Sequence, residues 1–152
     1  MKAEDVKKIA MIGAGDMGHG IAASCLLGGY TVVLRDIDQK FVDKGVAGII
    51  KSLEKFKEKG KITPDAFAHA LVRLIPMVDL KEAVKDADFI IEAVPEKLEI
   101  KKSVFAEIDQ YAPKHAILAS NTSNISITEI ASATQRPDKV IGYHFFNPAI
   151  LM

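Results

Sequence analysis

A glycine-rich turn near the N-terminus has the composition and spacing of a phosphate-binding loop. It consists of Gly13, Ala14, Gly15, Asp16, Met17 and Gly18, in the pattern G-x-G-x-x-G. The turn follows a short apolar run and opens a helical pattern, which is the context expected of a dinucleotide site rather than of a purely structural turn. Gly13 would permit the tight turn, Gly15 would let the backbone approach a pyrophosphate, and Gly18 would let helix and strand pack closely. We therefore predict that the phosphates of a dinucleotide bind at the N-terminus of this helix.

An acidic residue at the end of the next predicted strand indicates which dinucleotide would bind. Asp36 lies 23 positions after Gly13, where a carboxylate accepts hydrogen bonds from the adenosine ribose and repels a 2′-phosphate. The neighbouring Arg35 could bind such a phosphate, but adjacent residues of a strand point to opposite faces. The sequence therefore favours NAD over NADP.

Three further polar segments each follow a predicted strand. They are residues 92–96, 120–124 and 144–148, with the sequences EAVPE, SNTSN and HFFNP. Alone, a Ser/Asn loop is ordinary turn chemistry and a single histidine is more often structural than catalytic. In a doubly wound sheet, however, ligands bind beyond the carboxyl ends of the strands, so the three segments should meet the glycine turn in one crevice. His144 would there be able to exchange a proton near neutral pH, as oxidation of an alcohol requires.

The elements that would position these residues alternate along the chain. Apolar runs predict strands at 9–12, 31–34, 87–91, 116–119 and 140–143, and helical spacing of apolar residues predicts helices over 17–28, 42–56, 67–74 and 104–111. Thr63 before Pro64 is a helix start signal, and Ser126 with Glu129 forms a capping box. Strands that are apolar throughout and alternate with helices imply a parallel sheet covered on both faces. We predict an α/β, Rossmann-type doubly wound fold that forms one domain over residues 1–152.

Composition excludes several classes of protein. The chain has 152 residues with 20 basic and 20 acidic side chains, so bulk charge gives no reason to expect a nucleic acid as partner. A single cysteine, Cys25, forms no intrachain disulfide and leaves no Cys/His cluster for a structural metal. The charged N-terminus resembles no signal peptide, and no apolar run is long enough to span a membrane. These features predict a cytoplasmic protein without a membrane partner.

The four motifs, taken in order, resemble those of the L-3-hydroxyacyl-CoA dehydrogenase family along the whole chain. The combination of SNTS with the later GYHFFNP, residues 142–148, is the most specific part of the match. The resemblance implies NAD-dependent oxidation of a 3-hydroxyacyl-CoA to the 3-ketoacyl-CoA, a step of β-oxidation or butanoate metabolism. It implies His144 as general base, with Ser123 hydrogen-bonding the substrate oxygen. It also implies that Asn147 contacts the nicotinamide end and that Glu96 and Lys101 line the cofactor site.

The family also places acyl-CoA against the helix after the second strand, with Ser52 and Lys59 at the matching positions. Residues 51–61 carry five lysines and two glutamates in an otherwise neutral chain. Two interpretations remain open for this run, which are contact with the phosphates of CoA and an ordinary solvated helix face.

One departure concerns the C-terminal side of the family pattern. Family members have a glutamate that orients the histidine, in the strand after the HFFNP turn, and then a helical domain that completes the acyl pocket and a homodimer. The sequence ends at Met152, before both, so it resembles the NAD-binding half, and we expect that half to be poorly active alone. Two alternatives remain, namely another Rossmann dehydrogenase acting on a hydroxy acid and a non-catalytic NAD-binding module.

Overall fold

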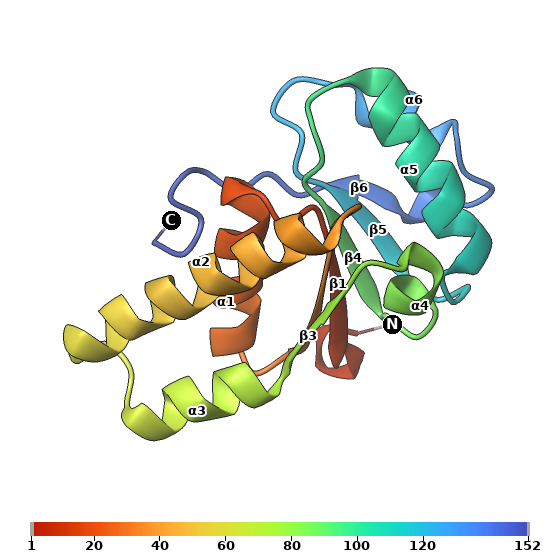
Figure 1. The fold of residues 1–152 in the computed structure, drawn as a ribbon. Helices are drawn as coiled ribbons and strands as arrows, with labels where there is room; N and C mark the ends of the chain where they lie inside the picture. Colours follow the sequence, from red (N-terminus) through yellow and green to blue (C-terminus); the bar gives the residue numbers. More distant parts are fainter. Residues whose placement is uncertain (1, 152) are drawn as a thin grey trace.

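A six-stranded parallel sheet forms the centre of the molecule (Figure 1), and the computed structural model describes residues 2–151. The spatial order of the strands is β3-β2-β1-β4-β5-β6, and every neighbouring pair is parallel. The strands are β1 (Lys8–Ile12), β2 (Thr31–Arg35), β3 (Leu74–Met77), β4 (Phe89–Glu92), β5 (Ile117–Ser120) and β6 (Val140–Gly142). The order reverses between β1 and β4, which is the switch point where doubly wound folds bind ligands. The predicted fold class is confirmed.

Helices cover both faces of the sheet (Figure 1). On one face lie α1 (Asp16–Leu27), α2 (Gln39–Glu58) and α3 (Pro64–Val72), and on the other lie α4 (Leu80–Val84), α5 (Leu98–Tyr111) and α6 (Ile127–Ala131). Short 3₁₀ turns occupy Ala3–Asp5 and Pro137–Lys139. In β1, Ala10 and Ile12 pack on the α5 face while Ile9 and Met11 pack on the α1 face. Both faces of the strand are buried, which is why it is apolar throughout rather than alternating.

Thr63 acts as the helix start signal that the sequence predicts, and Ser126 forms one of the two hydrogen bonds of the predicted capping box. The Thr63 hydroxyl accepts the Ala66 amide at 3.0 Å, ahead of Pro64 at the first position of α3. The Ser126 hydroxyl accepts the Glu129 amide at 3.4 Å at the start of α6. Such caps satisfy amides that have no acceptor within the helix.

Three features differ from the sequence-based expectations: Leu74 lies on a strand and not on a helix, and β3 and α4 have no predicted counterpart. Leu74 was placed on the helix that begins at Phe67, but α3 ends at Val72 and Leu74 begins β3. Pro76 within this short run argues against a central strand, and β3 is indeed the edge strand, where a missing N–H costs no ladder bond. The third predicted strand is also shifted, since β4 begins at Phe89 rather than at Ala87.

None of the helices between residues 2 and 151 combines the length and the apolar character that a membrane crossing requires. Met152, at which the sequence ends, lies outside the described residues.

Candidate functional site

The glycine turn joins β1 to α1 in a conformation that depends on its glycines. Gly13 has φ of +103°, and a Cβ atom on it would lie 2.6 Å from the carbonyl oxygen of Ala93. A Cβ atom on Gly18 would lie 1.8 Å from the Gly13 carbonyl oxygen. Side chains at these two positions would therefore collide with the protein itself, as the sequence pattern predicts for a tight turn and close packing.

Gly15 differs from the other two glycines because its missing side chain leaves open space. A Cβ atom there would meet nothing within 4 Å. Gly15 is also the N-cap of α1 and offers no capping side chain, so the amides of the first turn keep no acceptor within the helix. Open space beside unpaired amides at a helix N-terminus fits the diphosphate of a dinucleotide.

Asp36 follows β2 and is held by the backbone of the glycine turn. Its carboxylate accepts the Ala14 amide at 2.7 Å and the Ile37 amide at 2.7 Å. The side chain lines a hollow of about 520 Å³ between the start of α1 and α2. The Nε atom of Arg35 donates to the Val78 carbonyl at 2.8 Å, so this guanidinium is engaged beside β3. These contacts agree with the predicted orientation of the two side chains and with a ribose-binding carboxylate.

The segments that follow β4, β5 and β6 begin at the same edge as the glycine turn. Hydrogen bonds across the sheet continue past each strand, from Ala93 N to Ile12 O at 2.8 Å and from Asn121 N to Glu92 O at 2.8 Å. The side-chain oxygen of Asn121 then accepts the Phe145 amide at 2.7 Å. This bond ties the SNTSN segment to the HFFNP segment. The four segments therefore lie at one edge of the sheet, as expected.

A buried group of charged and hydroxyl side chains lies beneath two of these segments. The Glu92 carboxylate accepts the ammonium of Lys101 at 2.6 Å, the amide of Val94 at 2.6 Å and the hydroxyl of Ser120 at 2.6 Å. The side chains of Lys101 and Glu92 are 1% and 0% exposed. Lys101, which the family resemblance places at the cofactor, is therefore enclosed in an ion pair. The sequence gives no sign of this role for Glu92, because Lys101 and Ser120 lie on other elements.

Glu96 is the exposed member of this neighbourhood. Its side chain is 42% exposed, and one carboxylate oxygen lies 3.8 Å from the ammonium of Lys101. Its other oxygen accepts the hydroxyl of Thr122, whose own oxygen accepts the Ile125 amide at 3.0 Å. Glu96 is thus positioned from both sides and still faces the open edge.

The predicted catalytic side chains are exposed at this edge. His144, Ser123 and Asn147 are all solvent-accessible, and among the described residues no side chain of the three forms a hydrogen bond within the protein. The His144 ring packs against Phe146, with 4.8 Å between ring centres. The structure brings the segments together but gives the histidine no orienting acid among residues 2–151.

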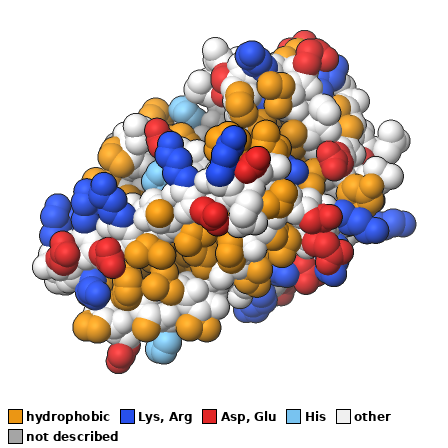
Figure 2. Space-filling view, in the orientation of Figure 1, with side chains coloured by type: hydrophobic (Ala, Val, Ile, Leu, Met, Phe, Trp, Pro, Cys, Tyr) orange, Lys and Arg blue, Asp and Glu red, His pale blue; other side chains and the backbone are white. Residues whose placement is uncertain are grey.

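Of the two residues matched to a CoA site, one lies at the hollow near Asp36 and one does not. Ser52 lines it together with Lys44, Lys51 and Lys55, whereas Lys59 is the C-cap of α2 and lies outside its lining. Figure 2 shows Lys and Arg side chains gathered along the edge of the molecule formed by α2.

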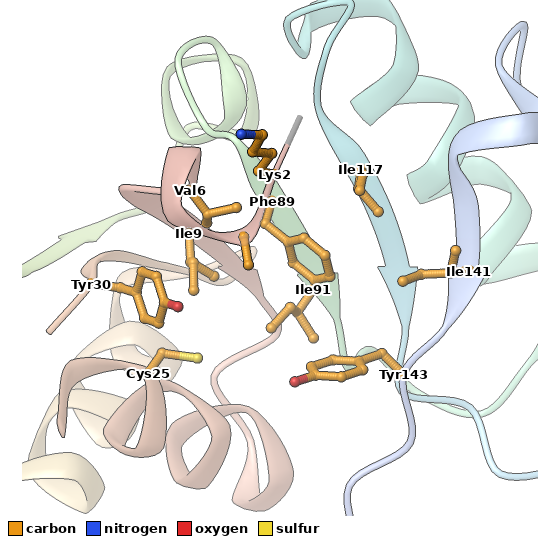
Figure 3. A pocket seen from close by; sticks show the side chains of 11 residues that line it. Lys2, Val6, Ile9, Cys25, Tyr30, Phe89, Ile91, Ile117, Ile141 and Tyr143 are labelled. Carbon is orange, nitrogen blue, oxygen red and sulfur yellow. The ribbon is translucent and has the colours of Figure 1, made fainter. Parts of the chain in front are cut away.

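A second hollow, of about 390 Å³, lies away from this edge and has a different character (Figure 3). Its lining is largely apolar and includes Ile9, Phe89, Ile91 and Tyr143. The thiol of Cys25 also lines this hollow. Burial raises the pKa of the thiol to about 11, so it stays protonated and unreactive at neutral pH. The groups that could carry out acid–base chemistry are at the carboxyl edge instead.

Comparison with known proteins agrees with this geometry. Residues 8–152 match the family model described as "3-hydroxyacyl-CoA dehydrogenase, NAD binding domain". The chain is 45% identical to the 3-hydroxybutyryl-CoA dehydrogenase of Clostridioides difficile, over 95% of its own length and 51% of that protein. It is 41% identical to the 3-hydroxyadipyl-CoA dehydrogenase of Escherichia coli, over 97% of this chain and 31% of that protein.

Solved structures give the same result. The (S)-3-hydroxybutyryl-CoA dehydrogenase of Ralstonia eutropha superposes with a TM-score of 0.92 at 39% identity, over 97% of this chain and 52% of that one. The chain thus spans between about a fifth and half of the relatives it matches. On its glycine turn, the acid that follows β2 and its match along nearly the whole sequence, the chain belongs to the 3-hydroxyacyl-CoA dehydrogenase family, as the family's NAD-binding domain.

Proposed function

We propose that this chain forms the NAD-binding part of an enzyme that oxidises (S)-3-hydroxyacyl-CoA to 3-ketoacyl-CoA, in fatty-acid β-oxidation or butanoate metabolism. The observation that carries the proposal is the hydrogen bond between Asn121 and the Phe145 amide, 2.7 Å long. It joins the serine-bearing and histidine-bearing segments at the edge where the glycine turn begins. A binding module without chemistry would have no need for an ionisable side chain at that junction.

The proposed roles follow from position. NAD, when bound, supplies the hydride acceptor. The imidazole of His144 takes the proton of the substrate hydroxyl, the general-base role that histidine most often fills in enzymes. Ser123, exposed on the adjoining segment, donates a hydrogen bond to the same oxygen and orients it.

The cofactor would extend across the sheet in one direction. Asp36 follows β2 and takes the adenosine ribose, while the glycine turn between β1 and α1 takes the diphosphate. The nicotinamide half would then lie over β4 and β5, which the strand order supports because these strands continue the sheet beyond β1. Glu96 faces the open edge there, and Lys101 lies beneath it. Asn147, on the segment after β6, is exposed at the same edge and would contact the nicotinamide end.

The test of this function is single-turnover transfer from NADH to acetoacetyl-CoA by a full-length protein that contains this domain, followed by loss of NADH absorbance in stopped flow. We expect transfer that is abolished in His144→Gln, with NAD affinity unchanged. Hydride transfer to a 2-keto acid at a higher rate than to acetoacetyl-CoA would favour the alternative that the protein is another Rossmann dehydrogenase, acting on a hydroxy acid. NAD binding without transfer to either substrate would favour the non-catalytic module.

The acyl-CoA would lie against α2 with its phosphates near Ser52 and Lys59. The supporting observation is the set of basic side chains, Lys44, Lys51 and Lys55, that line the hollow beside Ser52. Exposed charge contacts are screened by salt, so CoA affinity should fall as ionic strength rises. Titration of CoA into Lys59→Ala and into Lys55→Ala tests the contributions of the C-cap of α2 and of the hollow separately, with NAD as the control ligand. Unchanged CoA affinity in both variants would return the lysine run to a solvated helix face.

Assembly and location remain predictions of the same kind. A homodimer formed through a helical C-terminal domain is expected of the whole enzyme, and sedimentation of a protein that contains this domain tests it. A cytoplasmic location is also expected, although plant relatives bear peroxisomal and glyoxysomal names. Fractionation of cells that express the protein tests that expectation.

A further inference from the structure

We infer that Glu92 is a positioning residue for the nicotinamide half of NAD, because its buried carboxylate holds together the two segments that form that end of the site. The inference rests on the proposed placement of the nicotinamide over β4 and β5. Glu92 itself is completely buried and touches neither solvent nor ligand space. Its effect on the cofactor would be transmitted through its partners.

The three partners of Glu92 come from three different elements. Val94 is on the segment after β4, Lys101 is in the first turn of α5, and Ser120 ends β5. The Ser120 oxygen also lies 3.3 Å from the Thr122 amide, so the link continues into the SNTSN segment. One carboxylate therefore fixes both site segments against each other.

The position of Lys101 explains why a carboxylate is needed there. A cation in the first turn of a helix opposes the helix dipole, and a buried ammonium without a partner is strongly destabilising. Glu92 neutralises this charge at 2.6 Å, and the Val94 carbonyl adds a contact at 3.3 Å. A buried ion pair is often no better for stability than apolar residues of similar size, so stability is a weak reason for its presence.

Glu96 is the residue through which the buried pair would reach the cofactor. Its carboxylate lies between the ammonium of Lys101 at 3.8 Å and the hydroxyl of Thr122. Both neighbours are held by the buried group. Lys101 is paired directly with Glu92, and the Thr122 amide contacts the hydroxyl of Ser120, which itself donates to Glu92. Lys101 thus acts from beneath, by orienting Glu96, and not as an exposed cation against the cofactor.

The test compares two ligands that differ at one end. ADP-ribose occupies the sites of the glycine turn and Asp36 but has no nicotinamide, whereas NAD fills both halves. Calorimetry with Glu92→Gln should show NAD binding weakened about tenfold and ADP-ribose binding changed less than about twofold, the loss being confined to contacts at one end. The fluorescence change of NADH on binding, which reports the surroundings of the nicotinamide, should shrink in the same variant.

Two further variants separate positioning from stability. Glu92→Gln combined with Lys101→Met removes both charges, and should recover most of the thermal stability without recovering NAD affinity. Asp109→Asn breaks another closely held pair, Arg136–Asp109, 2.5 Å apart with side chains 13% and 9% exposed. Asp109 lies near the C-terminal end of α5, and Arg136 directly precedes the 3₁₀ turn Pro137–Lys139. Asp109→Asn should therefore lower Tm and leave the affinities for both ligands unchanged.

Three results would overturn the inference. They are equal weakening of NAD and ADP-ribose in Glu92→Gln, unchanged NAD affinity with unchanged NADH fluorescence in that variant, and NAD affinity that returns with Tm in the double variant. All of these measurements concern binding alone. They therefore leave the proposed dehydrogenase chemistry to be judged separately, by the His144→Gln single-turnover experiment.

Discussion

The two ends of the proposed cofactor site are built in different ways. At the adenosine end the fixed parts are mostly backbone, namely the positive φ of Gly13 and the amide of Ala14 that binds Asp36. At the other end the fixed parts are buried side chains, and the groups that would do the chemistry, Ser123 and His144, are exposed and unpaired among the described residues. The proposed binding groups are thus held in place by contacts among residues 2–151, whereas the proposed chemical groups have no side-chain partner among them. We therefore expect binding and turnover to respond differently to change.

The largest expected effect concerns turnover by the chain alone. A histidine base needs an orienting acid to fix its tautomer and stabilise the imidazolium. Because residues 2–151 offer His144 no such acid, we expect a protein of residues 1–152 to oxidise 3-hydroxybutyryl-CoA at least about a thousandfold more slowly than a full-length family member. Steady-state assay beside the 3-hydroxybutyryl-CoA dehydrogenase of Clostridioides difficile measures this, with NAD titration as the control for a folded site.

A rate near that of the full-length enzyme would contradict this expectation and remove the contrast between the two ends. It would mean that an acid within the chain orients His144. Glu92 is already bound to Lys101, Val94 and Ser120, so Glu96 would be the first residue to replace.

Gly15→Ala should affect the ligand and not the fold. The added Cβ meets nothing in the protein but fills the space next to the proposed diphosphate. We expect NAD affinity to fall about a hundredfold, the loss of one or two charged hydrogen bonds, with Tm almost unchanged. Calorimetry and thermal melts measure both quantities.

Gly18→Ala is the matched variant, because its Cβ would lie 1.8 Å from the Gly13 carbonyl. It should lower Tm as well as affinity. Equal thermal losses in the Gly15 and Gly18 variants would show that the open space at Gly15 has no connection with a ligand.

Asp36→Ala should narrow the preference for NAD over NADP. In the unchanged chain we expect NAD to bind roughly 10- to 150-fold more tightly, the value of one charged hydrogen bond. The variant should also weaken NAD itself, because the Ala14 amide loses its acceptor. Calorimetric titration of both cofactors measures the ratio.

Asp38→Ala is the control for Asp36. Asp38 caps α2 by accepting the Lys40 amide at 2.9 Å, so its loss should cost stability without changing the cofactor ratio. If the two variants changed the ratio alike, general loosening of this loop rather than the ribose contact would account for it.

The smallest effect concerns pH and lies at the opposite edge of the sheet. Burial alone would raise the pKa of Asp88, but the amides of Lys7 and Lys8 and the His115 imidazole stabilise its carboxylate and bring the pKa below the usual 3.8. A lowered folded-state pKa stabilises the protein above that usual value, and the benefit is lost as the pH falls through the folded pKa. Asp88→Asn should therefore lower Tm by a few degrees near pH 7, with a gap that closes below pH ~4. NAD affinity should stay unchanged, and a gap that widens in acid would contradict this.

Short-range sequence patterns were sufficient for most of the framework. The apolar run before Gly13, the Thr63 cap and the glycine spacing each depend on residues a few positions apart, and β1, the start of α3 and the glycine turn lie where these patterns indicated. β3 was missed because an edge strand with a proline lacks the apolar continuity of a central one. Its pairing with β2 is a long-range contact that local pattern does not encode.

The residues of the candidate site also fall into two groups, those that the sequence pattern predicts and those that only the folded structure brings together. Asp36 could be assigned from its distance to the glycine turn, because both belong to one strand–helix–strand unit. The burial of Lys101 could not, since a lysine in an amphipathic helix is normally solvated and its partner Glu92 ends a strand nine positions earlier. Ser120, the other side-chain partner of Glu92, is 28 positions away. A buried charge is tolerable only where folding brings such partners into contact, and that depends on how β4, β5 and α5 pack together.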